Sequence, residues 1–332
     1  MPMMRVGNAL DALVAGLRGR PPATADWQAV IALANRTLLT PDLFSSLAHA
    51  GQIQGLPQDV RAYLRFVHDC NRERNLRLRA QLTEAVAALN RRGIVPLLFK
   101  GAVPLFLSVA DRVPSRMTSD LDLGVEPAEE AIARMCLEGL GYIQVPGGRG
   151  AARQQDVGML ELRPVQGKGF APPRLVDRDG LRVKIPPPHS QALHWMVHDL
   201  LKEGDYWRGR IDLRHLHDLA RLAKSDDMDW TALQAAMADR GARNAFDTQL
   251  LALQQFFGIR IPASCVRPMA RFQHWRRVFT AKHPVLGAPL RLAGNLAWGA
   301  RRFLHADGLA RRGPLDLGRR VVRTLFYSRA KI

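Results

Sequence analysis

The sequence predicts an α+β fold in which a small sheet-bearing unit lies between two helical regions. Residues 57–91 carry apolar side chains at three- and four-residue steps, the spacing of amphipathic helices. Helix start and stop signals indicate further helices in the rest of 1–92 and in 188–265. Short apolar runs and alternating segments are confined to about residues 94–185, as expected for strands. We therefore expect four regions: a helical region at 1–92, an α/β unit at 93–187, a helical bundle at 188–265 and a basic, helical tail at 266–332.

Start and stop signals divide the N-terminal region. Pro21-Pro22 ends an opening helix, and Thr24 or Asp26 can cap the next one, since short polar side chains accept the free backbone N–H groups of a first turn. Residues 57–91 form one long apolar-periodic stretch with many arginines at its exposed positions. Gly93 follows at the usual position of a helix stop.

The central unit alternates strands with short helices. Residues 94–99 form a short apolar run typical of a buried strand. A hairpin is predicted at 174–185, turning at Asp179-Gly180. The other expected elements are a helix at 102–109, strands at 121–125, 142–145 and 157–164, a helix at 127–140, and a Gly/Arg loop at 147–152.

Two carboxylates lie two residues apart in the run Ser119-Asp120-Leu121-Asp122-Leu123. Alternate side chains of a strand share a face, so Asp120 and Asp122 should project together while the leucines face a core. Crowded carboxylates repel each other unless a cation lies between them. Hard divalent cations such as Mg²⁺ take such oxygen ligands together with substrate phosphates. The pair therefore indicates a metal site, although a solvated edge strand would show the same pattern.

Residues on either side of this pair fit phosphate chemistry. Lys100-Gly101 sits between a strand and a predicted helix start, where exposed N–H groups favour phosphate. Arg116 precedes the carboxylates and could contact a triphosphate. Glu161 lies in an apolar strand. It is either a third metal-site carboxylate or a surface residue paired with an arginine such as Arg163.

Three runs carry a resemblance to a known family: Leu97-Leu98-Phe99-Lys100-Gly101-Ala102, Arg116 to Leu123, and Leu140-Gly141-Tyr142. Together they resemble the uncharacterised nucleotidyltransferase family of bacteria, a branch of the DNA polymerase beta-like nucleotidyltransferase superfamily. The stretch from His194 to Ala220 is similar to that family's helical half. The resemblance covers roughly residues 60–262.

The resemblance implies a mixed-sheet nucleotidyltransferase palm flanked by helical regions. It implies that Asp120, Asp122 and Glu161 are catalytic and bind Mg²⁺ or Mn²⁺. It further implies that an NTP is bound by residues at the glycine-bearing helix start and before the Asp pair: Lys100, Gly101, Ala102, Arg116 and Ser119. The expected reaction transfers a nucleoside monophosphate from the NTP to an unknown acceptor, which is a small molecule, a peptide or RNA.

Two departures from the family pattern motivate an alternative. Ala102 stands where the superfamily commonly has serine, and Arg163 stands where histidine is usual after the third acidic residue. The alternative is a catalytically inactive binding protein that keeps the fold. It would use the basic tail to engage RNA, an anionic membrane or a protein partner.

His194 and His198 lie four residues apart on a predicted helix. They could contact a metal or phosphate, but polar packing is the favoured interpretation. A metalloprotease motif is excluded because no glutamate follows His194.

The net charge of +18 comes mainly from the C-terminal part of the chain. From Arg267 onward there are 15 Lys and Arg but only two acids. Residues 301–332 interleave arginine with apolar residues, so they could contact anionic lipid, contact RNA phosphates or pack on the body. The three cysteines are widely spaced, and no long uncharged apolar stretch is present. We expect a cytoplasmic protein, with attachment to the inner membrane face left open.

Overall fold

The computed structural model describes residues 3–109, 112–146, 150–165, 171–237, 239–261 and 267–304. Contacts divide the chain into two compact units. The sheet unit is Ile53–Gln191, and the helical unit combines Met1–Gln52 with Ala192–Ile332. Within the described part of the chain, no helix has both the length and the apolar character needed to cross a bilayer.

The sheet unit is built on a seven-stranded mixed sheet of order β3-β4-β5-β2-β1-β7-β6. The β2/β5 and β1/β7 pairs are parallel, and the other four pairs are antiparallel. This mixed sheet with flanking helices confirms the predicted fold class. The strands are β1 (Leu97–Phe99), β2 (Asp120–Val125), β3 (Ile143–Gln144), β4 (Gly150–Ala152), β5 (Met159–Pro164), β6 (Arg174–Arg178) and β7 (Leu181–Ile185).

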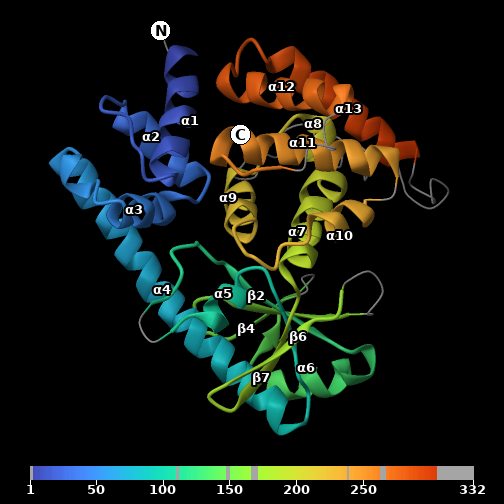
Figure 1. Ribbon diagram of the computed structural model, residues 1–332. Helices are drawn as coiled ribbons and strands as arrows, with labels where there is room; N and C mark the ends of the chain where they lie inside the picture. The colour runs from blue at the N-terminus through green and yellow to red at the C-terminus, as the bar shows by residue number, and fades with distance from the viewer. Residues whose placement is uncertain are drawn as a thin grey trace. The chain divides into compact units, whose positions relative to one another are not determined.

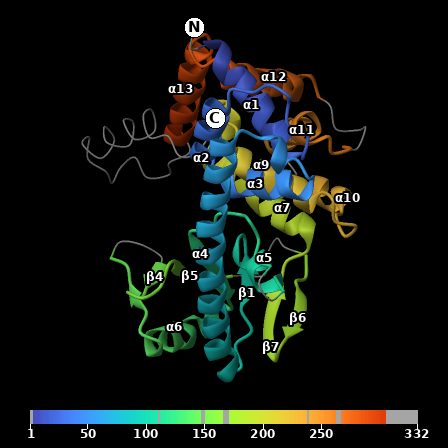
Figure 2. The same ribbon diagram turned by 90° about the vertical axis from the view of Figure 1, so that its left-hand side faces the viewer.

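Figure 2 shows the long helix α4 (Gln58–Arg91) passing across the sheet. Its leucines, from Leu78 to Leu89, share one core with Leu98, Leu121 and Leu160 of the central strands. The register pairs Leu98 with Leu123 and Leu121 with Leu160, so these leucines lie on one face of the sheet. The opposite face of β2 and β5 therefore carries Asp120, Asp122 and Glu161. The remaining elements of this unit are η1 (Ile53–Gly55), α5 (Ala102–Leu107), η2 (Pro127–Glu129) and α6 (Glu130–Gly139).

The sheet confirms one local prediction from the sequence and corrects another. Asp179 and Gly180 both have positive φ, 53° and 76°, which confirms the predicted hairpin turn between β6 and β7. The prediction of a loop over the whole of 147–152 is wrong, because Gly150–Ala152 forms β4 between β3 and β5. Residues 147–149 lie outside the described residues.

The helical unit (Figure 1) contains one helix start that the sequence predicted. Asp26 accepts the backbone N–H of Ala29 at 3.1 Å, which confirms it as the cap of the second helix. Two helices, α12 and α13, lie in the predicted basic tail, and residues 305–332 are outside the described part. The helices are α1 (Met3–Leu17), α2 (Trp27–Arg36), α3 (Thr40–His49), α7 (Pro188–Met196), a π-helix η3 (Val197–Lys202), α8 (Asp205–Arg208), α9 (Leu213–Leu222), α10 (Trp230–Ala235), α11 (Arg240–Phe257), α12 (Pro268–Lys282) and α13 (Ala288–Leu304).

Candidate active site

Three carboxylates meet where β2 and β5 run side by side. The parallel register places Asp122 directly opposite Glu161, and Asp120 lies two residues earlier on β2. One ligand oxygen from each of the three lies within 4.8 Å of the others. Asp122 is only 1% exposed, so its charge is held away from water. The structure thus brings together the three residues that the sequence singled out as metal ligands.

Two cations offset the charge of Asp122. Lys100 Nζ donates to Asp122 Oδ1 at 3.0 Å, and Arg163 Nη2 donates to the same oxygen at 2.5 Å. The same Arg163 nitrogen also forms a short contact with Glu161 Oε2. Burial raises the pKa of Asp122, an effect that Lys100 opposes and Asp120 reinforces. The second oxygen, Asp122 Oδ2, is buried without a hydrogen-bond partner.

The predicted nucleotide-binding residues surround this cluster in different ways. Lys100 has φ +48°, an uncommon conformation for a residue with a side chain, and its ammonium contacts Asp122 rather than open solvent. Ser119 Oγ donates to Asp120 Oδ1 at 2.7 Å. Ala102 is fully buried in the core, so only its backbone could serve a ligand.

Gly101 is packed tightly against the loop that precedes β2. A Cβ built on Gly101 would lie 2.6 Å from Thr118 Cγ2 and 3.0 Å from Arg116 Nη1. Arg116 is buried, and its guanidinium donates to Thr118 Oγ1 at 3.3 Å. The strand–glycine–helix turn and Arg116 are therefore neighbours in space, 15 residues apart in sequence.

Polar side chains of α4 hold the two segments that lead into the carboxylate strands. Asn75 Nδ2 donates to the carbonyls of Pro114 and Arg116, at 2.7 and 2.9 Å. Arg74 donates to the carbonyls of Thr118 and, at 2.9 Å, Val157. Asn71 Nδ2 donates one hydrogen bond to Ser115 O, and Gln81 Nε2 donates one to Gly158 O, both at 2.8 Å.

We call Asn71, Arg74, Asn75 and Gln81 the α4 tether. Arg74 alone bonds to both segments, so it fixes the starts of β2 and β5 relative to each other. Sequence reasoning missed these residues because polar side chains on an arginine-rich helix resemble a solvated face. Asn75 could have revealed them, because it is a small amide inside the apolar stripe of the helix. Its side chain is fully buried.

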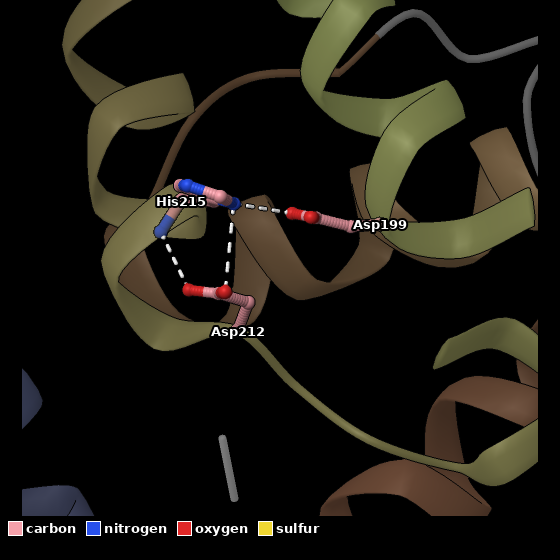
Figure 3. Close-up of side chains that lie close together, drawn as sticks. All are labelled: Asp199, Asp212 and His215. Carbon is pink, nitrogen blue, oxygen red and sulfur yellow. Dashed lines mark hydrogen bonds and ion pairs between the residues drawn. The ribbon is translucent and has the colours of Figure 1, made fainter. Parts of the chain in front are cut away.

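A second compact group lies in the helical unit (Figure 3). His215 Nδ1 lies 2.6 Å from Asp199 Oδ2 and 3.4 Å from Asp212 Oδ2. Burial lowers the pKa of His215, but Asp212 and Asp199 outweigh it, and the net shift is upward. Asp212 also caps α9 by accepting the His215 backbone N–H at 3.0 Å. The contact between His215 and Asp199 joins the π-helix to α9.

The histidines of the predicted helix pair are separated by a change of helix type. His194 lies in α7, and His198 lies in the π-helix that follows. His198 Nδ1 lies 3.1 Å from Asp199 Oδ1, so His198 belongs to the same polar network as His215.

The sequence model of the uncharacterised nucleotidyltransferase family matches residues 23–258. The chain belongs to this family. The match includes both the carboxylate strands and the α4 tether of this nucleotidyltransferase family member. No curated protein matches the sequence.

Two solved structures are similar to this family member. One is an antigenic nucleotidyltransferase-like protein from Paracoccidioides brasiliensis, with 18% identity and a TM-score of 0.38, over 57% of this chain and 95% of that one. The other is the antibiotic-resistance factor ANT(2'')-Ia, with 14% identity and a TM-score of 0.33, over 55% of this chain and 98% of that one.

Proposed function

We propose that this family member transfers a nucleoside monophosphate from an NTP to an acceptor, with Mg²⁺ or Mn²⁺ held by Asp120, Asp122 and Glu161. The observation that carries the proposal is the group of three carboxylates from two parallel strands, with ligand oxygens within 4.8 Å. The acceptor stays open among small molecules, peptides and RNA. We expect the reaction in the cytoplasm, where NTPs and Mg²⁺ are available.

The carboxylate group fits a hard divalent cation. Its donors are all oxygens, which Mg²⁺ and Mn²⁺ prefer. Asp122 Oδ2 is buried and lacks a hydrogen-bond partner, a costly state for a carboxylate unless something binds it. A bound divalent ion would neutralise phosphate charge and orient the reacting oxygens.

The residues of the chain supply binding, orientation and proton transfer in the proposed reaction. An acceptor hydroxyl forms a bond to the α-phosphorus, the bond to the β-phosphate oxygen breaks, and pyrophosphate leaves. Glu161, with a side chain 21% exposed, accepts the hydroxyl proton. Lys100 and Arg163 already contact the carboxylates, and both can turn toward phosphate oxygens as these arrive, because neither side chain is fully buried.

Phosphate positioning would fall to the glycine turn and its neighbours. Gly101 lets the helix start pack closely against Thr118 and Arg116, and Ser119 orients Asp120. The missing serine at Ala102 removes one hydroxyl from this set, so backbone N–H groups and Arg116 would have to hold the triphosphate. Such transfer depends mainly on positioning and charge neutralisation.

Calorimetry with Mg²⁺ and a non-hydrolysable NTP, followed by a screen of labelled NTPs for transfer to small molecules, peptides and tRNA, tests the proposal. Asp122→Asn should abolish metal-dependent nucleotide binding and transfer. Asp177→Asn, an exposed carboxylate on β6 of the same sheet, is the matched control and should change neither. If wild type binds no NTP in Mg²⁺, or if Asp122→Asn binds and transfers normally, the proposal is wrong and the inactive binding protein becomes the better account.

A further inference from the structure

Seven of the seventeen large apolar side chains exposed in the described chain lie between Met269 and Leu296. On α12 they recur at three-residue steps and share a face, and on α13 they lie one turn apart. Two more occupy the turn between these helices. The set is Met269, Phe272, Trp275, Val285, Leu286, Leu292 and Leu296, each between 49% and 66% exposed. We call it the apolar face.

Both helices contact the segment 206–210, and α12 also packs on α11 and α1. Arg276 of α12 donates to the carbonyls of Tyr206 and Trp207, and Arg277 donates to that of Arg210. On α13, Gly294 is so close to the same segment that an added Cβ would lie 2.4 Å from Trp207 O. The buried side of α12 faces α11 and this segment, and the buried side of α13 faces α8. The exposed apolar side chains of both helices therefore lie on their solvent sides.

The solvent side of α13 is unusual for a surface helix. Pro289, Leu292, Ala293, Leu296 and Ala297 are all exposed, where polar residues normally stand. An exposed apolar area of this kind marks a binding surface.

The basic charge around the apolar face indicates which kind of partner it binds. Residues 267–304 contain eight Lys and Arg and no acid. Arg276 and Arg277 are buried, whereas Arg271 and Arg301 are exposed. A second copy of this strip would be repelled by like charge. The segment 305–332, with seven basic residues against two acidic ones, would be repelled as well.

We propose that the apolar face binds the surface of an anionic phospholipid membrane. Arginines beside inserted leucine and tryptophan side chains are the pattern of a helix lying in the lipid interface. Nucleic acid suits the face less well, because Leu292, Leu296 and Val285 gain nothing from phosphate. The apolar face belongs to the helical unit and the carboxylates to the sheet unit, and the membrane proposal stands whether or not the proposed transfer occurs.

Sedimentation of the full chain with vesicles tests the proposal. The protein should bind vesicles of phosphatidylcholine mixed with phosphatidylglycerol and not phosphatidylcholine alone, and salt should weaken the binding. Leu292→Ser/Leu296→Ser should lower the partition coefficient by about tenfold or more, since burying each leucine contributes several CH₂ groups. The matched control is Phe66→Ser/Met135→Ser in the sheet unit, whose side chains are 67% and 69% exposed, and it should bind like wild type.

Fluorescence gives a second readout that does not depend on the leucine variant. The fluorescence of Trp275 is obtained as the difference between the wild-type spectrum and that of Trp275→Phe. It should shift to the blue when anionic vesicles are added. Equal vesicle binding by the leucine variant, equal binding to both lipid mixtures, or a Trp275 signal that only RNA shifts would each overturn the proposal. So would self-association that the leucine variant abolishes in the absence of lipid.

Discussion

Arg163→Gln tests whether an arginine neutralises the carboxylate group in the absence of metal. The Arg163 guanidinium contacts both Asp122 and Glu161. Its removal leaves three neighbouring carboxylates with Lys100 as the remaining cation that contacts Asp122 in the structure described. The apoprotein should therefore lose stability, and a divalent cation should restore most of it.

The size of the effect follows from burial. Two unit charges about 4 Å apart interact by about 4 kcal/mol at an effective dielectric constant of about 20. Arg163 is 29% exposed, however, and Asp122 only 2%, so water screens one partner. A value between that of surface pairs and that of broken buried pairs, ~1–3 kcal/mol, is expected.

Urea unfolding with EDTA measures the stability that the apoprotein loses, and urea unfolding with saturating Mg²⁺ measures how much of it the metal restores. In EDTA the variant should be less stable by that amount. In Mg²⁺ the difference should shrink below about 1 kcal/mol, because ligand bound only to the folded state adds stability. Arg77→Gln, which breaks an exposed pair with Glu73 on α4, is the control and should cost under about 0.5 kcal/mol in both buffers. An equal loss with and without Mg²⁺ would refute the idea that arginine and metal share these ligands.

Three further predictions concern the surroundings of the site and the second polar group. Asn75→Ala leaves two carbonyls before β2 without their donor and should lower the free energy of unfolding in urea by about 2 kcal/mol. It should also weaken Mg²⁺ binding. Unchanged metal affinity would mean that the α4 tether stabilises the fold without positioning the carboxylates. Gly101→Ala forces a Cβ against that loop and should lower stability by about 1–3 kcal/mol; a Tm equal to wild type would contradict the packing. The raised pKa of His215 beside Asp199 and Asp212 contributes stability that is complete below the unfolded value of about 6.5 and is lost as pH rises through the folded value. His215→Gln should flatten that part of the stability–pH curve, and an unchanged curve would rule the group out.

Local chemistry was enough to predict many elements. The Asp179-Gly180 turn, the Asp26 cap and the two-residue spacing of Asp120 and Asp122 each depend on neighbours in sequence. The Glu161 position opposite Asp122 was not readable, since strand order and register are set by pairing between distant segments. β4 was missed because three small residues carry too weak an alternation.

Two features of the candidate site depend on tertiary context. The contact of Arg163 with both Asp122 and Glu161 follows from the parallel β2/β5 register. The sequence alone suggested a pair between Arg163 and Glu161 but not the contact with Asp122. The helix α4 was predicted correctly, but its register relative to the loops before β2 and β5 decides which amides become buried. No periodicity within residues 57–91 contains that information.

The α4 tether binds main-chain carbonyls, and every one of its acceptors before β2 and β5 is a backbone oxygen. Every residue type carries such an oxygen. Side chains in these two segments can therefore change in the course of evolution without loosening the strands that hold Asp120 and Glu161. A framework of this kind tolerates changes of side chain in the loops, whereas replacing Arg74 or Asn75 removes donors that no loop residue supplies.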